Sequence, residues 1–198
     1  MRNKIIGYSA LALALALVVL ALLSWLLSAT MGEGVRSLLS SEGIRFFLGG
    51  FTTMLLHPAL IWILLLAMAW GCMKGSGIFQ LFRAPHSTFT SRHSLILPAV
   101  LLIIYVCVVL LLTVTPHAVL LSSTGRLWPS AFSRALVPLV AFGLILFSTA
   151  YGIMSRRFLS LADICQSLTN GIASAAPLLL LYVLFMQLLA SLRFVFAF

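Results

Sequence analysis

Residues 11–23 read LALALALVVLALL and lie within an apolar stretch from about Ile5 to Ala29. The leucine/alanine alternation has the period of a strand, but the stretch exceeds the roughly 20 residues that a helix needs to cross a bilayer. Its length therefore predicts a membrane-spanning helix. Arg2 and Lys4 precede it, as in a signal peptide, but a signal sequence has only about 7–15 apolar residues, which favours an uncleaved anchor.

The composition of the whole chain agrees with this interpretation. The 198 residues are 63% hydrophobic and only 8% charged, and the mean hydropathy is +1.20. So few charges cannot cover a water-soluble domain, whose charged fraction is typically about 25%. Intrinsic disorder is excluded as well, because it requires low hydrophobicity and high charge.

Four further apolar stretches are long enough to cross a membrane, namely about 51–73, 95–115, 135–154 and 173–197. Residues 35–50, VRSLLSSEGIRFFLGG, are too short and too polar to span, and their apolar positions recur at helical spacing. This pattern predicts an amphipathic helix at the interface. We therefore expect an all-α integral membrane protein with about five transmembrane helices and one interfacial helix, in which residues 1–198 form a single membrane domain.

The net charge of +9 arises from twelve Lys and Arg against three Asp and Glu. Most of these cations lie between apolar runs, where they orient a membrane protein, so we expect no nucleic-acid partner. Seven lie on the N-terminal side of the predicted topology, namely Arg2, Lys4, Lys74, Arg83, Arg92, Arg156 and Arg157. The other side has Arg36, Arg45, Arg126 and Arg134, and Arg193 is near the end of the last span. This bias predicts a multi-pass protein of the cell (inner) membrane with a cytoplasmic N-terminus.

Catalytic chemistry lacks its usual residues in this chain. No Asp, Glu, Lys or Arg lies in the middle of a predicted span, and Glu33, Glu42 and Asp163 fall in predicted loops. Paired carboxylates and a Ser/His/Asp triad are therefore missing. The cysteines are odd in number and have no metal-ligand spacing, which supports neither a disulfide framework nor a zinc site. We expect no enzyme, no metal and no cofactor.

The polar candidates at membrane depth are His57 and Gln187. His57 could bind a ligand or a proton, although an interfacial histidine bonded to a neighbouring carbonyl is the simpler interpretation. Gln187 could line a substrate pathway, but an interhelical hydrogen bond explains it equally well. Among the prolines, only Pro138 and Pro177 lie where they could mark the broken helices of a transporter.

Two stretches resemble the AbgT family of p-aminobenzoyl-glutamate transporters. Residues 33–51, EGVRSLLSSEGIRFFLGGF, lead into a span that ends in WGCMKGSGI at 70–78. They are similar to the family's VRxLLSxEGIRFxL helix and the span that follows it. Residues 123–138, STGRLWPSAFSRALVP, lead to AYGIMSRR at 150–157 and resemble TGxLLPSPFxxxIVP and PGxAYG. The likeness extends over about 31–79 and 122–187.

The departures from this family concern its transport core. Members are more than twice as long and form the substrate route from re-entrant hairpins that have no counterpart here. Lys74 replaces a family glutamate, and Phe147 and Ser148 replace a Pro-Gly pair. The resemblance therefore implies no particular substrate-binding residue.

Two functions follow as expectations. The resemblance implies transport of p-aminobenzoyl-glutamate or related aromatic acids, with a small anionic aromatic substrate. The missing hairpins and charges favour instead a non-transporting scaffold or subunit of a larger membrane complex. In both cases we expect the lipid bilayer as a partner, together with a second copy of the chain or other membrane subunits.

Overall fold

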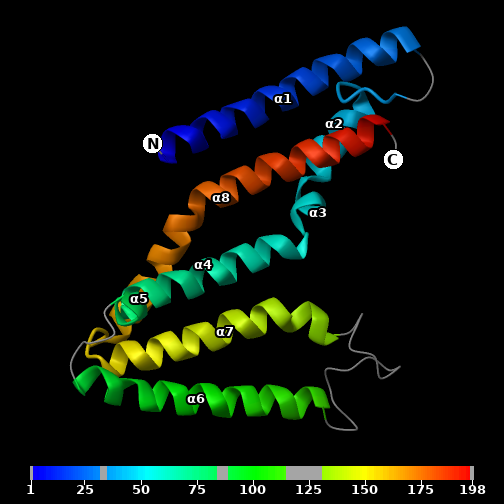
Figure 1. Cartoon of the computed structure of the whole chain (residues 1–198). Coiled ribbons are helices and arrows are strands. Elements are labelled where there is room, and N and C mark those ends of the chain that lie inside the picture. Colours follow the sequence, from blue (N-terminus) through cyan, green and yellow to red (C-terminus); the bar gives the residue numbers. More distant parts are fainter. Residues whose placement is uncertain (1, 32–34, 84–88, 115–130, 197–198) are drawn as a thin grey trace. The chain divides into compact units, whose positions relative to one another are not determined.

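The computed structural model describes residues 2–31, 35–83, 89–114 and 131–196, so Glu33, Arg126 and Trp128 lie outside the described residues. The described residues are mostly helical and include no strand (Figure 1). Five of the helices formed by these residues are long and apolar enough to span a membrane, which confirms the predicted all-α membrane fold. The elements are α1 (Arg2–Met31), α2 (Ser41–Gly49), α3 (Phe51–Leu55), α4 (Pro58–Ser76), α5 (Ile78–Arg83), α6 (Phe89–Val114), α7 (Ala131–Met154) and α8 (Leu161–Phe196).

The second span differs from the predicted range of 51–73. Residues 51–55 form the separate short helix α3, the chain leaves helical geometry at Leu56 and His57, and α4 begins at Pro58. Proline disfavours helical geometry in the residue before it and has no backbone N–H to donate. The spanning helix therefore starts at Pro58 and extends to Ser76.

The predicted interfacial helix over 35–50 is shorter in the structure. Residues 35–40 are not helical, and α2 begins only at Ser41. The Ser40 side chain accepts a hydrogen bond from the backbone N–H of Gly43 at 3.1 Å and so caps this helix. Glu42 lies in the first turn, where a negative charge stabilises the positive end of the helix dipole.

The last helix begins twelve residues before the predicted span of 173–197, and Asp163 is part of it rather than of a loop. The backbone N–H of Ser160 donates to Asp163 Oδ2 at 2.9 Å, and the N–H of Asp163 donates back to Ser160 Oγ at 3.3 Å. This reciprocal pair resembles a capping box, which satisfies free N–H groups at a helix start. It therefore starts α8 ahead of the apolar residues.

The chain divides into two compact units, and the prediction of one membrane domain stays a prediction. Unit 1 comprises residues 1–61 and 176–198, and unit 2 comprises residues 62–175. In unit 1 the segment after α1 bridges two helices. Arg36 N–H donates to the carbonyl of Val195 in α8 at 3.0 Å, and Leu38 N–H donates to Ser24 Oγ in α1 at 3.1 Å.

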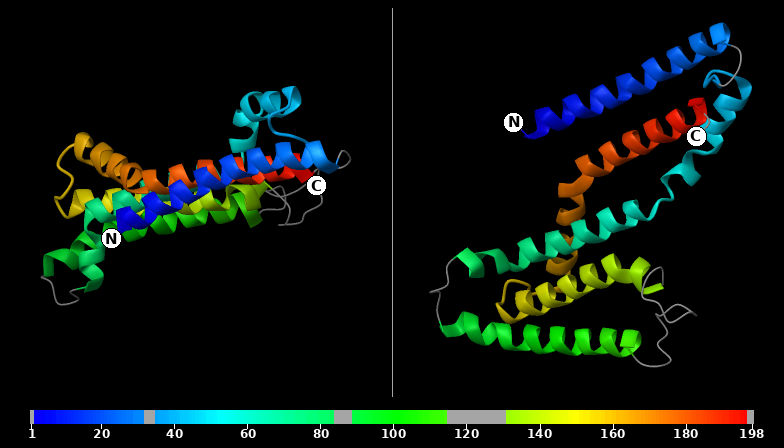
Figure 2. Two further views of the ribbon diagram at one scale, coloured as in Figure 1. Left: turned by 90° about the horizontal axis from the view of Figure 1, so that it is seen from above. Right: turned by 45° about the vertical axis from the view of Figure 1, so that its right-hand side comes forward.

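Within unit 2, α6 and α7 lie side by side and antiparallel (Figure 2). The Tyr105 hydroxyl donates to the carbonyl of Leu139 at 2.9 Å, and the Ser94 hydroxyl donates to that of Met154 at 3.4 Å. The second bond lies at the end of the pair where α6 begins and α7 stops, and the first joins the interiors of the two helices. The helices α6, α7 and α8 continue through their internal prolines, so Pro138 and Pro177 do not mark broken helices.

Also within unit 2, α4 crosses the start of α8 at two glycines. A Cβ atom placed on Gly71 would lie 2.5 Å from the Cα of Gly171, far closer than atoms can approach. Ala67 and Ser167 flank the crossing and are buried. Small residues four apart on both helices therefore bring the two backbones into contact, as is common between membrane helices.

Candidate ligand groove in unit 1

Each unit has a groove with polar residues in its wall. The groove of unit 2 measures about 360 Å³, and the groove of unit 1 measures about 640 Å³ and is lined by His57. It takes its walls from α2, from α3 and the break after it, and from the last turns of α8. The break before Pro58 contributes directly, because its two non-helical residues, Leu56 and His57, both line the groove. The lining residues are Phe46, Thr53, Met54, Leu56, His57, Pro58, Met186, Leu189, Ala190, Arg193 and Phe194.

His57 is the residue before the first turn of α4 and caps that helix. Its ring Nδ1 accepts a hydrogen bond from the backbone N–H of Ala59 at 3.3 Å, and its carbonyl accepts from Leu60 N–H at 3.2 Å. The partner of the ring is thus an N–H group and not the carbonyl expected from the sequence. Since Nδ1 accepts, the neutral ring has its hydrogen on Nε2, which leaves one donor for a ligand. The side chain is exposed and lines the groove.

Arg193 brings a positive charge to the same groove. It lies in the last turn of α8 and is exposed, and no carboxylate among the described residues forms an ion pair with it. The adjacent Phe194 stacks on Phe46 of α2, with ring centroids 4.4 Å apart and planes inclined by 20°. The guanidinium carbon of Arg36 lies over the Phe194 ring, 6.0 Å from its centroid. One wall therefore combines a positive charge with aromatic surface.

Gln187 is buried but does not line this groove. Its side chain is 3% exposed, and neither Nε2 nor Oε1 has a hydrogen-bond partner among the described residues. Ser191 lies one turn later on α8, is fully buried and is equally unpartnered. The interhelical hydrogen bond considered for Gln187 is therefore not formed in this structure. A buried amide without partners costs roughly 1–3 kcal/mol, so this position is poised to bind a polar group.

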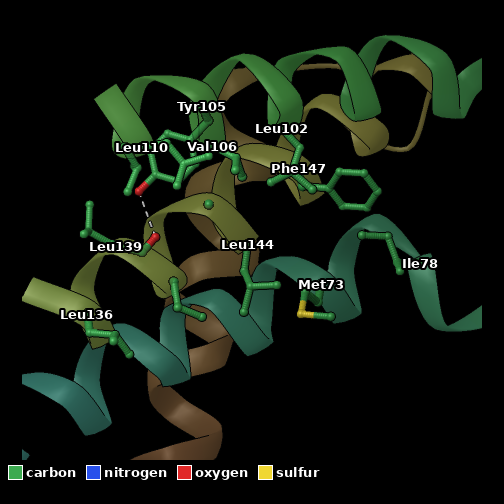
Figure 3. A pocket seen from close by; sticks show the side chains of 13 residues that line it. Met73, Ile78, Leu102, Tyr105, Val106, Leu110, Leu136, Leu139, Leu144 and Phe147 are labelled. Carbon is green, nitrogen blue, oxygen red and sulfur yellow. Dashed lines mark hydrogen bonds between the residues drawn. The ribbon is translucent and has the colours of Figure 1, made fainter. Parts of the chain in front are cut away.

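The apolar pocket of unit 2 has a different character (Figure 3). It measures about 500 Å³ and lies between α6, α7 and the end of α4, with Met73, Leu102, Leu144 and Phe147 around it. The one hydroxyl on its wall, that of Tyr105, donates to the carbonyl of Leu139, as the dashed line shows. None of the described residues that line this pocket is charged, so they offer nothing that would neutralise an anionic ligand.

The groove of unit 1 can therefore bind a molecule with an acidic group and an apolar or aromatic body. Arg193 and the Nε2–H of His57 are donors for a carboxylate, while Phe46, Phe194 and two methionines provide apolar contact. The sequence indicated His57 but gave no role to Arg193. An arginine within an apolar terminal helix is unusual enough to have been the signal for it.

Comparison of the chain with protein-family models, with curated proteins and with solved structures finds no match.

Proposed function

We propose that this protein is an AbgT-like membrane transport protein for p-aminobenzoyl-glutamate or related aromatic acids. The observation that carries the proposal is the groove of unit 1, in which Arg193, which forms no ion pair with a described residue, lies beside the stacked rings of Phe46 and Phe194. Such a ligand combines carboxylates with an aromatic ring, and these two features match a cation and an aromatic wall. The sequence resemblance supports the same substrate class.

In this proposal the protein is non-enzymatic and lies in the cell (inner) membrane with its N-terminus in the cytoplasm. Arg193 binds a substrate carboxylate, and His57 donates from Nε2 to a second polar group of the substrate. Gln187 accepts or donates a hydrogen bond when the substrate moves deeper along α8. Its amide has no competing partner in the described structure, which makes it available for this role.

The test is uptake of radiolabelled p-aminobenzoyl-glutamate into proteoliposomes that contain only this chain, with and without ion gradients. We expect saturable uptake. Arg193→Gln should raise the KM about tenfold or more, because a hydrogen bond to a charged group contributes about 1.5–3 kcal/mol. Arg45→Gln is the matched control, since it removes an exposed cation of unit 1 that does not line the groove.

The alternative function is a non-transporting membrane scaffold or subunit. It is favoured by the absence of Asp, Glu, Lys and Arg from the middle of the spans, because ion-coupled carriers usually have such groups at membrane depth. Absence of uptake by well-inserted protein would support this alternative. Uptake that Arg193→Gln and Arg45→Gln reduce equally would reject the assigned groove while leaving transport intact.

A further inference from the structure

The end of unit 2 where α4 stops has a strong excess of positive charge. Lys74 is exposed in the last turn of α4, and Arg156 and Arg157 are exposed in the turn between α7 and α8. Asp163 is the one acidic residue of this unit. Its Oδ2 accepts the backbone N–H groups of Leu159 and Ser160 at 2.9 Å each, so this carboxylate is occupied by the start of α8.

Direct contacts hold the basic turn against the end of α4. The Arg157 guanidinium lies over Gly77, which has a φ of +78° and ends α4, and it donates to Oε1 of Gln80. A side chain on Gly77 would collide with this guanidinium. The adjacent Phe158 is buried, and its ring would be 3.4 Å from a Cβ atom on Gly75. The turn that carries Arg156 and Arg157 therefore packs against the end of α4, which carries Lys74.

A groove of about 360 Å³ lies between α4 and α8, and among the described residues Lys74 is its one charged lining residue. Two groups on its wall have hydrogen-bond donors to spare. Lys74 forms no ion pair with a described residue. Asn170 accepts a hydrogen bond from Gln166 Nε2 at its Oδ1, at 3.2 Å, and its NH2 group has no acceptor among the described residues. The hydroxyls of Ser167 and Ser174 already donate to backbone carbonyls. An ammonium and an amide NH2 together favour an anion.

The neighbouring aromatic side chains indicate where this anion comes from. Trp70 lines the groove and is 55% exposed, and its ring is tilted against that of Phe79 with centroids 5.0 Å apart. Exposed tryptophan at the end of a spanning helix is typical of the lipid headgroup level. Basic pockets between membrane helices bind anionic headgroups at that level.

We propose that this groove binds the phosphate of an anionic glycerophospholipid, with Lys74 and Asn170 on the phosphate and Trp70 against the glycerol and upper acyl chain. The lipid then contacts α4 and α8 beside the crossing of Gly71 and Gly171. Bound lipid should therefore stabilise unit 2. This role is independent of whether the chain transports a substrate.

The test measures the thermal unfolding of the full chain in neutral detergent with added phosphatidylglycerol or phosphatidylcholine. We expect phosphatidylglycerol to raise the Tm and phosphatidylcholine to leave it nearly unchanged. Lys74→Gln and Asn170→Ala should each weaken the binding of phosphatidylglycerol about tenfold, measured by titration of the Tm shift. Lys4→Gln removes an exposed cation of unit 1 and should retain the full shift.

Three outcomes would overturn the proposal. Equal shifts with both lipids would show that headgroup charge is irrelevant, and an unchanged titration in Lys74→Gln would place the lipid elsewhere. The third is a shift of the same size with millimolar inorganic phosphate alone, which would identify a site for free phosphate rather than for lipid. Because Lys74 is exposed, its replacement should leave the fold intact, and the Tm of each variant without lipid checks this.

Discussion

The two units of the chain differ in how closely their helices pack. In unit 2, glycines at 71 and 171 let α4 and α8 approach until their backbones touch. In unit 1, the helix breaks before Pro58 and an open groove follows. The buried side chains of Gln187 and Ser191 have no hydrogen-bond partner within the part of the chain that the structure describes. Unit 2 thus has close backbone packing, whereas unit 1 has buried polar groups whose hydrogen bonds are not formed by the described residues. The difference indicates that the glycine crossing stabilises unit 2, whereas the groove of unit 1 offers a place for the proposed substrate.

The largest effect is expected at the glycine crossing. Gly71→Leu should destabilise the protein by about 3 kcal/mol or more, because its Cβ would fall 2.5 Å from the Cα of Gly171 and the backbones would have to separate. Chemical unfolding in detergent micelles measures this. Gly7→Leu is the control, since a Cβ there meets nothing within 4 Å. Equal effects of the two substitutions would remove the claimed difference between the units.

A gain of stability is expected in unit 1. Gln187→Leu should stabilise the protein by about 1–2 kcal/mol, because it replaces two unpaired polar atoms with apolar surface of similar size. The same unfolding assay measures it, with Ser191→Ala as a second, smaller case. A loss of stability would mean that the amide of Gln187 has a partner.

Uptake by the Gln187→Leu variant distinguishes a substrate-binding role of Gln187 from a packing role. If the amide binds the moving substrate, uptake falls although the protein becomes more stable. If the side chain only packs, uptake stays intact. Stability and uptake that fall together would instead report general damage to the helix.

A smaller loss is expected where a single hydrogen bond joins two helices of unit 2. Tyr105→Phe removes the donor to the carbonyl of Leu139 and should cost about 1 kcal/mol. Tyr8→Phe is the control, because that side chain is 72% exposed. If both variants unfold like the parent protein, the hydroxyl of Tyr105 makes no net contribution to the pairing of α6 and α7.

The smallest effect concerns the cap at the helix break. His57→Ala should destabilise the protein by about 0.5–1 kcal/mol, because the N–H of Ala59 loses its acceptor. His57→Asn should retain the cap and the stability, since asparagine is a good capping residue. A drop in substrate affinity with Asn at normal stability would assign the ring a binding role. Normal affinity with Asn would restrict His57 to capping.

Much of the helical architecture could be predicted because hydropathy depends only on local composition. The fourth span of 135–154 is an example, since all twenty residues are apolar or small and form the end of one helix. The first residue of a helix was harder to predict than the presence of a helix. The predicted start at 51 ignored the effect of Pro58 on the residues before it, and the predicted start at 173 ignored the capping pair of Ser160 and Asp163.

The candidate site was less accessible to sequence reasoning. His57 was singled out because it is a histidine beside a proline in an apolar segment, and it does line the groove. Arg193 and Phe194 lie more than 130 residues further along the chain, and no local pattern relates them to Phe46. The glycines at 71–77 also differ in role, since Gly77 follows the end of α4 with a positive φ, whereas Gly71 lies within α4 at a helix crossing.

The sequence by itself determined that this chain belongs in a membrane and that it crosses as helices, because a bilayer selects long apolar stretches that satisfy their own backbone hydrogen bonds. Only the tertiary structure decided which side chains meet. It stacked Phe46 on Phe194, left Gln187 without a hydrogen-bond partner among the described residues and brought the backbones of Gly71 and Gly171 into contact. Lipid is as apolar as leucine and gives little preference for one helix face over another. Shape and single polar contacts, which hydropathy does not encode, therefore decide the packing.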